Sequence, residues 1–83
     1  MTPSDETRKY VKENYIEPAR ARGDPEVSVR AGDVHQAVGY SNRLPLIVSA
    51  LGALKFRRYA NVELVRTDGP LMSTTTTSTF RIV

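Results

Sequence analysis

The sequence predicts an α+β domain made of three short helices and a small antiparallel sheet of three strands. Three segments carry apolar residues at helical spacing, and three others alternate or are rich in β-branched residues. The length of 83 residues allows one modest core, since chains of this size bury roughly 60 to 65% of the surface that the unfolded chain exposes. The expected order is helix, strand, helix, helix, strand, loop, strand.

The first helix is expected to begin at Thr2. Thr2 is a good N-cap, Pro3 loses no hydrogen bond at the first helical position, and Asp5 completes a pattern similar to a capping box. We expect Pro18 to kink or end the helix near Glu17. The apolar stripe of this helix consists of Tyr10, Val11, Tyr15 and Ala19, with Ile16 beside it.

The next two elements are short. Residues 26–30 alternate around Val27 and Val29, which predicts the first strand. A helix is expected from Gly32 to Gly39, because Asp33 complements the helix dipole at its start and glycine is a common helix stop. The apolar face predicted for this helix consists of Val34, Ala37 and Val38.

A tight link of Tyr40 and Ser41 leads into a third helix, with Asn42 or Ser41 as its N-cap and an expected end near residues 55–58. The predicted core stripe consists of Leu44, Ile47, Val48, Leu51 and Leu54. A hairpin then closes the chain, with strands in 61–67 and 74–83 and a turn at 68–70. Its core-facing residues are expected to be Val62, Leu64, Phe80 and Ile82.

The composition excludes several classes of protein. With no cysteine, the chain is neither a disulfide scaffold nor a thiolate zinc finger. The polar residues 1–14 are unlike a secretory signal, and no apolar run is long enough to cross a membrane. We therefore expect a cytoplasmic protein that does not enter a membrane.

The positive charge is concentrated in the later part of the chain. The net charge is +3 and the pI is about 9.6. Residues 1–26 hold five basic and six acidic groups, whereas residues 27–83 hold seven basic and three acidic groups. This distribution suggests a polyanionic partner.

The chain is not expected to be an enzyme. His35 is the only histidine, too few ligands for a transition metal without cysteine, and we interpret it as a polar residue of its helix. The sequence shows no acid/base pair and no glycine-rich phosphate loop. We also expect too little room for a pocket of typical volume. The sequence indicates no catalytic residue, metal, cofactor or small-molecule substrate.

The element order resembles the winged helix-turn-helix family over nearly the whole chain. The resemblance depends on the Gly32–Gly39 segment, the Tyr40-Ser41 link, the Asn42–Lys55 helix and the Asn61–Val83 hairpin. It implies three helices packed on a three-stranded antiparallel sheet. It also implies a transcriptional regulator or nucleoid-type protein that binds double-stranded DNA. The helix from Asn42 would enter the major groove, and residues 68–77 would form a wing on the adjacent backbone or minor groove.

Within that resemblance, Arg43 is the best candidate for base contact, because arginine pairs bidentately with guanine. Asn42 suits either adenine contact or helix capping. The cations near the helix end suit either phosphate contact or capping of its carbonyl groups. The candidate nucleic-acid-binding residues are Asn42, Arg43, Ser49, Lys55, Arg57, Arg58, Arg66, Thr74 and Thr75.

Two other functions remain open from the sequence. A face made of Leu46, Ala50 and Ala53 offers no hydrogen-bond donors from its side chains, so the domain is alternatively a protein-protein interaction module that uses this face. RNA binding is a weaker possibility, because Phe80 is expected in the core and no aromatic platform is evident. Homodimerisation is also possible.

Overall fold

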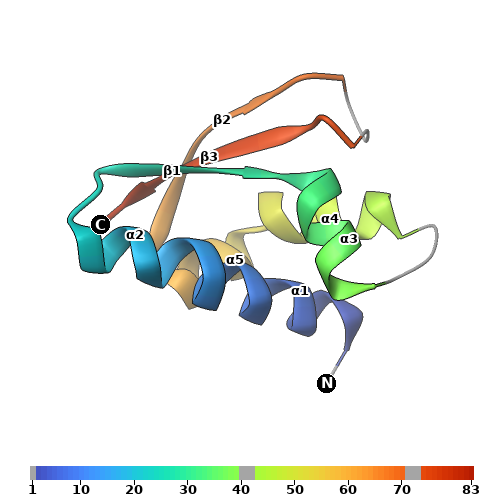
Figure 1. The fold of residues 1–83 in the computed structure, drawn as a ribbon, viewed down its shortest axis with the longest axis horizontal. Helices are drawn as coiled ribbons and strands as arrows, with labels where there is room; N and C mark the ends of the chain where they lie inside the picture. The colour runs from blue at the N-terminus through green and yellow to red at the C-terminus, as the bar shows by residue number, and fades with distance from the viewer. Residues whose placement is uncertain (1, 40–42, 71–73) are drawn as a thin grey trace.

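The computed structural model describes residues 2–39, 43–70 and 74–83. One long helical segment opens the chain, made of α1 (Pro3–Val11), the π-helix η1 (Lys12–Ile16) and α2 (Glu17–Arg22) (Figure 1). The Thr2 hydroxyl accepts a hydrogen bond from the backbone N–H of Asp5 at 3.1 Å, which confirms the predicted N-cap.

The helical segment continues past Pro18, which lies in its last part. Proline has no N–H to donate to the carbonyl four residues earlier, and its ring needs room there. Just before it, the backbone N–H of Glu17 donates to the carbonyl of Lys12, a wider turn of the π type. The chain therefore remains helical up to Gly23, which adopts a left-handed conformation with φ 79°.

The sheet has three antiparallel strands, β1 (Glu26–Arg30), β2 (Val62–Asp68) and β3 (Thr77–Ile82), in the order β1-β3-β2 among the described residues. This result confirms the α+β class. The register shifts between Leu64, which is opposite Phe80, and Arg66, which is opposite Thr79. Val65 is therefore the extra residue of a β-bulge and is 37% exposed.

The remaining helices are α3 (Ala31–Val38), α4 (Leu44–Gly52) and α5 (Leu54–Ala60). The prediction that one helix continues to residues 55–58 is wrong, because Ala53 is extended (φ −77°, ψ 145°). Leu54, predicted for the core, is 50% exposed. Instead, the break turns Phe56 inward, where its ring meets Phe80 edge-on at a centroid distance of 5.1 Å.

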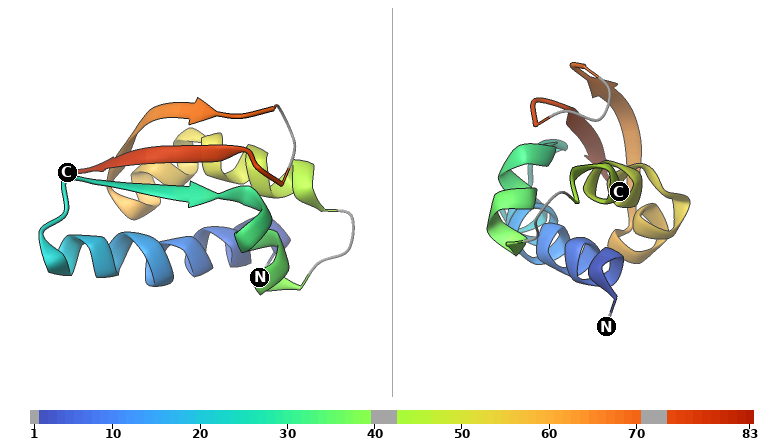
Figure 2. Two further views of the ribbon diagram at one scale, coloured as in Figure 1. Left: turned by 45° about the horizontal axis from the view of Figure 1, so that its top comes forward. Right: turned by 90° about the vertical axis from the view of Figure 1, so that its right-hand side faces the viewer.

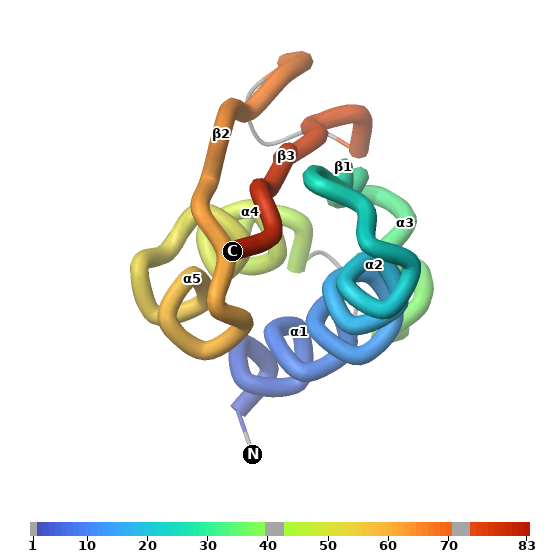
Figure 3. The backbone as a smooth tube through the Cα atoms, turned by 90° about the vertical axis from the view of Figure 1, so that its left-hand side faces the viewer, coloured from blue at the N-terminus to red at the C-terminus, as the bar shows by residue number. Residues whose placement is uncertain are grey.

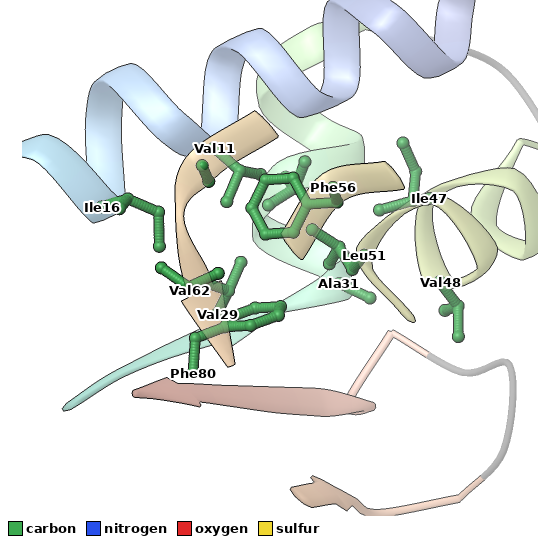
Figure 4. Close-up of a cluster of buried hydrophobic side chains, with 12 residues drawn as sticks. Val11, Ile16, Val29, Ala31, Ile47, Val48, Leu51, Phe56, Val62 and Phe80 are labelled. Atoms are coloured by element: carbon green, nitrogen blue, oxygen red, sulfur yellow. The ribbon is translucent and has the colours of Figure 1, made fainter. Parts of the chain in front are cut away.

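The core lies between the helices and one face of the sheet (Figures 1 and 4). The hairpin prediction is confirmed: Val62 and Phe80 are buried, and Leu64 and Ile82 pack partly against them. Ala37, expected on the inner face of α3, is exposed. The buried cluster consists of Val11, Ile16, Val29, Ala31, Val34, Ile47, Val48, Leu51, Phe56, Ala60, Val62 and Phe80.

The chain after the hairpin tip is attached to the start of α3. The backbone N–H groups of Ala31 and Gly32 donate to the carbonyl oxygens of Thr76 and Thr74 at 2.8 and 3.0 Å. A Cβ atom at Gly32 would lie 2.6 Å from the Thr74 carbonyl oxygen, so this close approach requires glycine. In the described ranges, no helix is long and apolar enough to span a bilayer.

Candidate nucleic-acid interface

The helix α4 has one buried and one solvent-facing side. Its buried residues are Ile47, Val48, Ala50 and Leu51. Pro45, Ser49 and Gly52 are exposed and lie at the spacing of a single helix face. Because these side chains are small and uncharged, a negatively charged backbone could approach this face of α4 closely.

The chain around α4 contains no carboxylate. Between Asp33 and Glu63 the sequence has no acidic residue and four cations, namely Arg43, Lys55, Arg57 and Arg58. All four lie in the described part of the chain, on α5 or directly before α4. The segment that contains α4 and α5 therefore carries only positive formal charge.

Arg43 directly precedes α4 and is exposed. Its backbone N–H donates to Nε2 of His35 on α3 at 3.2 Å, and its carbonyl accepts from the N–H of Ile47 at 3.1 Å. His35 thus acts as a structural polar group that connects α3 to the start of α4. These two bonds hold the Arg43 backbone in place beneath an exposed side chain. Asn42, predicted as a cap or an adenine contact, lies outside the described residues.

The expected single cluster of Lys55, Arg57 and Arg58 at the end of the recognition helix is wrong, since α4 ends at Gly52 and these cations lie on α5. The side chain of Arg57 is half-buried, and its Nη2 donates to the Gly52 carbonyl at 3.3 Å. The capping interpretation is therefore confirmed for Arg57.

Lys55 and Arg58 border different hollows on α5. Arg57 and Arg58 line an open hollow of about 370 Å³ between α5 and the start of β2. Lys55 lines a separate hollow between α5 and α1, and its Nζ is 3.9 Å from Oδ1 of Asp5. Of the three predicted cations, Arg58 alone is exposed on the β2 side of α5.

The hairpin offers fewer outward polar groups than its sequence suggests. Arg66 on β2 is exposed and pairs with Asp68, with 2.9 Å between Nε and Oδ2. Thr74 and Thr75 are exposed, as predicted. Further along the same strand arm, the hydroxyl-bearing residues Thr76, Ser78 and Thr79 are buried.

The start of α4 and the hairpin tip lie at the same end of the molecule (Figure 1). Seen from that end, α4 is nearly end-on, with the hairpin above it and α5 beside it (Figure 2, right). Arg43 and the exposed threonines therefore share one end, while Arg58 lies at the opposite end of α4, near the base of β2.

The face proposed for protein interaction is not an exposed surface. Ala50 is 4% exposed, and Leu46 packs against the core. The third residue of the predicted face, Ala53, is half-buried at the break between α4 and α5. The prediction that this face is exposed is wrong, because α4 turns a different side to solvent.

The hollow between α1 and α5, which the sequence did not predict, is open and has a volume of about 510 Å³. Its volume lies in the typical range of pockets, contrary to the expectation of too little room for one. At its edge Arg8 donates to Asp5, and this bond, together with the Thr2 hydroxyl, lowers the pKa of Asp5 from 3.8 to about 2. Across the described ranges, no group of three potential metal ligands comes together.

Comparison of the chain with models of protein families, with curated proteins and with solved structures gives no match.

Proposed function

We propose that this chain is a winged-helix domain that binds double-stranded DNA, with α4 in the major groove and the β2–β3 hairpin on the neighbouring backbone. The order of elements and the β1-β3-β2 sheet are compatible with that arrangement. The observation that carries the proposal is the charge of the segment between Asp33 and Glu63, which has four cations and no carboxylate. Of these four cations, Arg43 and Arg58 are exposed outside the α1–α5 contact, and exposed cations of this kind attract a polyanion.

In this proposal phosphate contacts supply most of the affinity. Arg58 and Arg66 are exposed on neighbouring elements, α5 and β2, and their guanidinium groups suit phosphate oxygens. The Arg66–Asp68 pair is exposed and such pairs contribute little, so a phosphate can displace Asp68. The hydroxyl groups of Thr74 and Thr75 add uncharged donors at the hairpin tip.

Base recognition is limited to few groups. On the outer face of α4, Pro45 and Gly52 have no side-chain donor and Ser49 has one hydroxyl. Arg43, at the amino end of α4, is the side chain suited to bidentate contact with guanine. We therefore propose a DNA-binding protein with low sequence specificity, of the regulator or nucleoid type, with Arg43 as its main base contact.

The test is fluorescence anisotropy with a labelled duplex of about 20 base pairs at low salt, about 50 mM. Arg43→Ala, Arg58→Ala and Arg66→Ala should each weaken binding by about three- to ten-fold. The matched control is Lys9→Ala, which removes one exposed positive charge from α1, away from the hairpin. If Lys9→Ala weakens binding as much as the other three variants, only net charge matters and the proposed face is wrong.

A further inference from the structure

The hollow between α1 and α5 lies on the side of the molecule away from the hairpin. Figure 3 shows α5 next to α1, with β2 rising from α5 in the opposite direction. The hollow has a volume of about 510 Å³, within the range of small-molecule sites. It is lined by Asp5, Arg8, Lys9, Lys55 and Tyr59.

The size of the hollow favours a small molecule over an extended chain. Its α1 residues span positions 5 to 9, and its α5 residues span positions 55 to 59. Each span is little more than one helical turn, about 6 Å along the axis. An extended peptide or a nucleic-acid strand needs a longer track than this.

The charge around the hollow is positive. Asp5 forms an ion pair with Arg8, a residue of the last turn of α1 that is 9% exposed. Lys9 is exposed, and the side chain of Lys55 is 72% exposed at 3.9 Å from Asp5. Because the Asp5–Arg8 pair is neutral as a unit, the two lysines leave a net positive charge at the opening.

The walls also present carbon surface. Tyr59 is 46% exposed, so part of its ring is open to a ligand. The Nζ atom of Lys12 lies 4.9 Å from the centroid of this ring, a cation–π contact that restricts its motion. The aliphatic stems of Lys9 and Lys55 extend the apolar surface beside the ring.

We propose that the α1–α5 hollow binds a small organic anion with an apolar body, such as a carboxylate or sulfonate on an aromatic frame. The apolar body would lie against Tyr59 and the lysine stems, and the acid group would lie between the ammonium groups of Lys9 and Lys55. The inference is independent of DNA binding, since none of these contacts involves α4 or the hairpin.

The test uses anilinonaphthalene sulfonate, whose fluorescence rises in apolar surroundings, with the full chain. Saturable binding to one site is expected. The shifts of backbone amide NMR signals should be concentrated in residues 5–12 and 55–59. Lys9→Gln and Lys55→Gln should each weaken binding by roughly two- to five-fold, and Tyr59→Ala should weaken it further. The matched control is Arg81→Gln, which removes an exposed cation from β3 and should leave binding unchanged.

A second control separates charge from simple apolar binding. Phenylnaphthylamine has the same rings without the sulfonate and should bind more weakly than the sulfonate. Circular dichroism melting of each variant verifies that the fold is intact. The proposal is overturned if the NMR shifts lie outside the hollow, if the lysine variants bind as tightly as the unchanged protein, or if the uncharged probe binds equally well.

Discussion

The guanidinium group of Arg57 donates from Nη2 to the carbonyl oxygen of Gly52 at 3.3 Å, across the break between α4 and α5. This bond gives the end of α4 a positively charged partner, as favoured by the helix dipole. It also holds Arg57 inward, whereas its neighbour Arg58 is exposed. Two adjacent arginines therefore have different roles, one in the fold and one on the surface.

Replacing Arg57 by methionine keeps the apolar stem and removes the bond to Gly52. We expect the free energy of unfolding to fall by about 1 kcal/mol. The loss is moderate because the bond is long and because Arg57 Nε, buried without a partner among the described residues, no longer has to be desolvated. The measurement is the urea midpoint at an unchanged m-value. Arg58→Met is the control, and an equal loss there would refute the structural role of Arg57.

The second prediction concerns the attachment of the hairpin to α3. In Gly32→Ala the new methyl group would lie 2.6 Å from the Thr74 carbonyl oxygen, so the backbone must move and the hydrogen bond to Thr74 lengthens. We expect the free energy of unfolding to fall by about 1–3 kcal/mol, measured by denaturant unfolding.

Gly52→Ala is the matched control. A Cβ atom at Gly52 meets nothing within 4 Å in the described structure. Alanine is also the better helix former, so stability should stay the same or rise by up to about 1 kcal/mol. Equal destabilisation by both alanine substitutions would show that the contact between Gly32 and Thr74 is not important.

Local patterns in the sequence correctly predicted much of the fold. Thr2 and Pro3 gave the first helix its start, and the alternation of Val62 with Leu64 and of Phe80 with Ile82 identified the inner face of the hairpin. These features depend on residues close together in the chain. The α+β class follows from them.

The break after α4 could not be predicted in the same way. Leu54 continues the apolar spacing of α4, so the periodicity alone favours one longer helix. The break accompanies the packing of Phe56 against Phe80, a contact between residues far apart in the sequence. Gly52, a weak helix former, was the one local sign of a break.

The candidate site was predictable only in part. The exposure of Arg43, Ser49 and Arg66 agrees with their predicted surface positions. The separation of Lys55 from Arg57, and the burial of Ala50, both depend on the end and rotation of α4. The α1–α5 hollow joins residues about 50 positions apart, and no local pattern marks it.

The third prediction follows from the lowered pKa of Asp5. A carboxyl group whose pKa is about 2 in the folded chain, against 3.8 as its ordinary value, stabilises the fold at neutral pH. This contribution is present above pH 3.8 and is lost as the pH falls through 2. Asp5→Asn should therefore lower the melting temperature at pH 7, and the difference from the unchanged protein should shrink between about pH 4 and pH 2.

A double-variant cycle with Arg8→Met isolates the cause. The hydrogen bond from Arg8 is the largest contribution to the low pKa of Asp5. In the Arg8→Met background, most of the pH-dependent effect of the Asp5→Asn substitution should disappear. An effect that persists at full size would assign the low pKa to another group.

The central claim, that the α4–hairpin face binds DNA through its phosphates, is tested most directly by the salt dependence of the affinity. Arg58 and Arg66, the two exposed cations assigned to phosphates, predict a slope of log K against log salt of about −2, and Arg58→Ala should reduce its magnitude by about 0.9. Absence of binding even at about 50 mM salt, or a slope that is the same in the Arg58→Ala/Arg66→Ala double variant, would contradict the account.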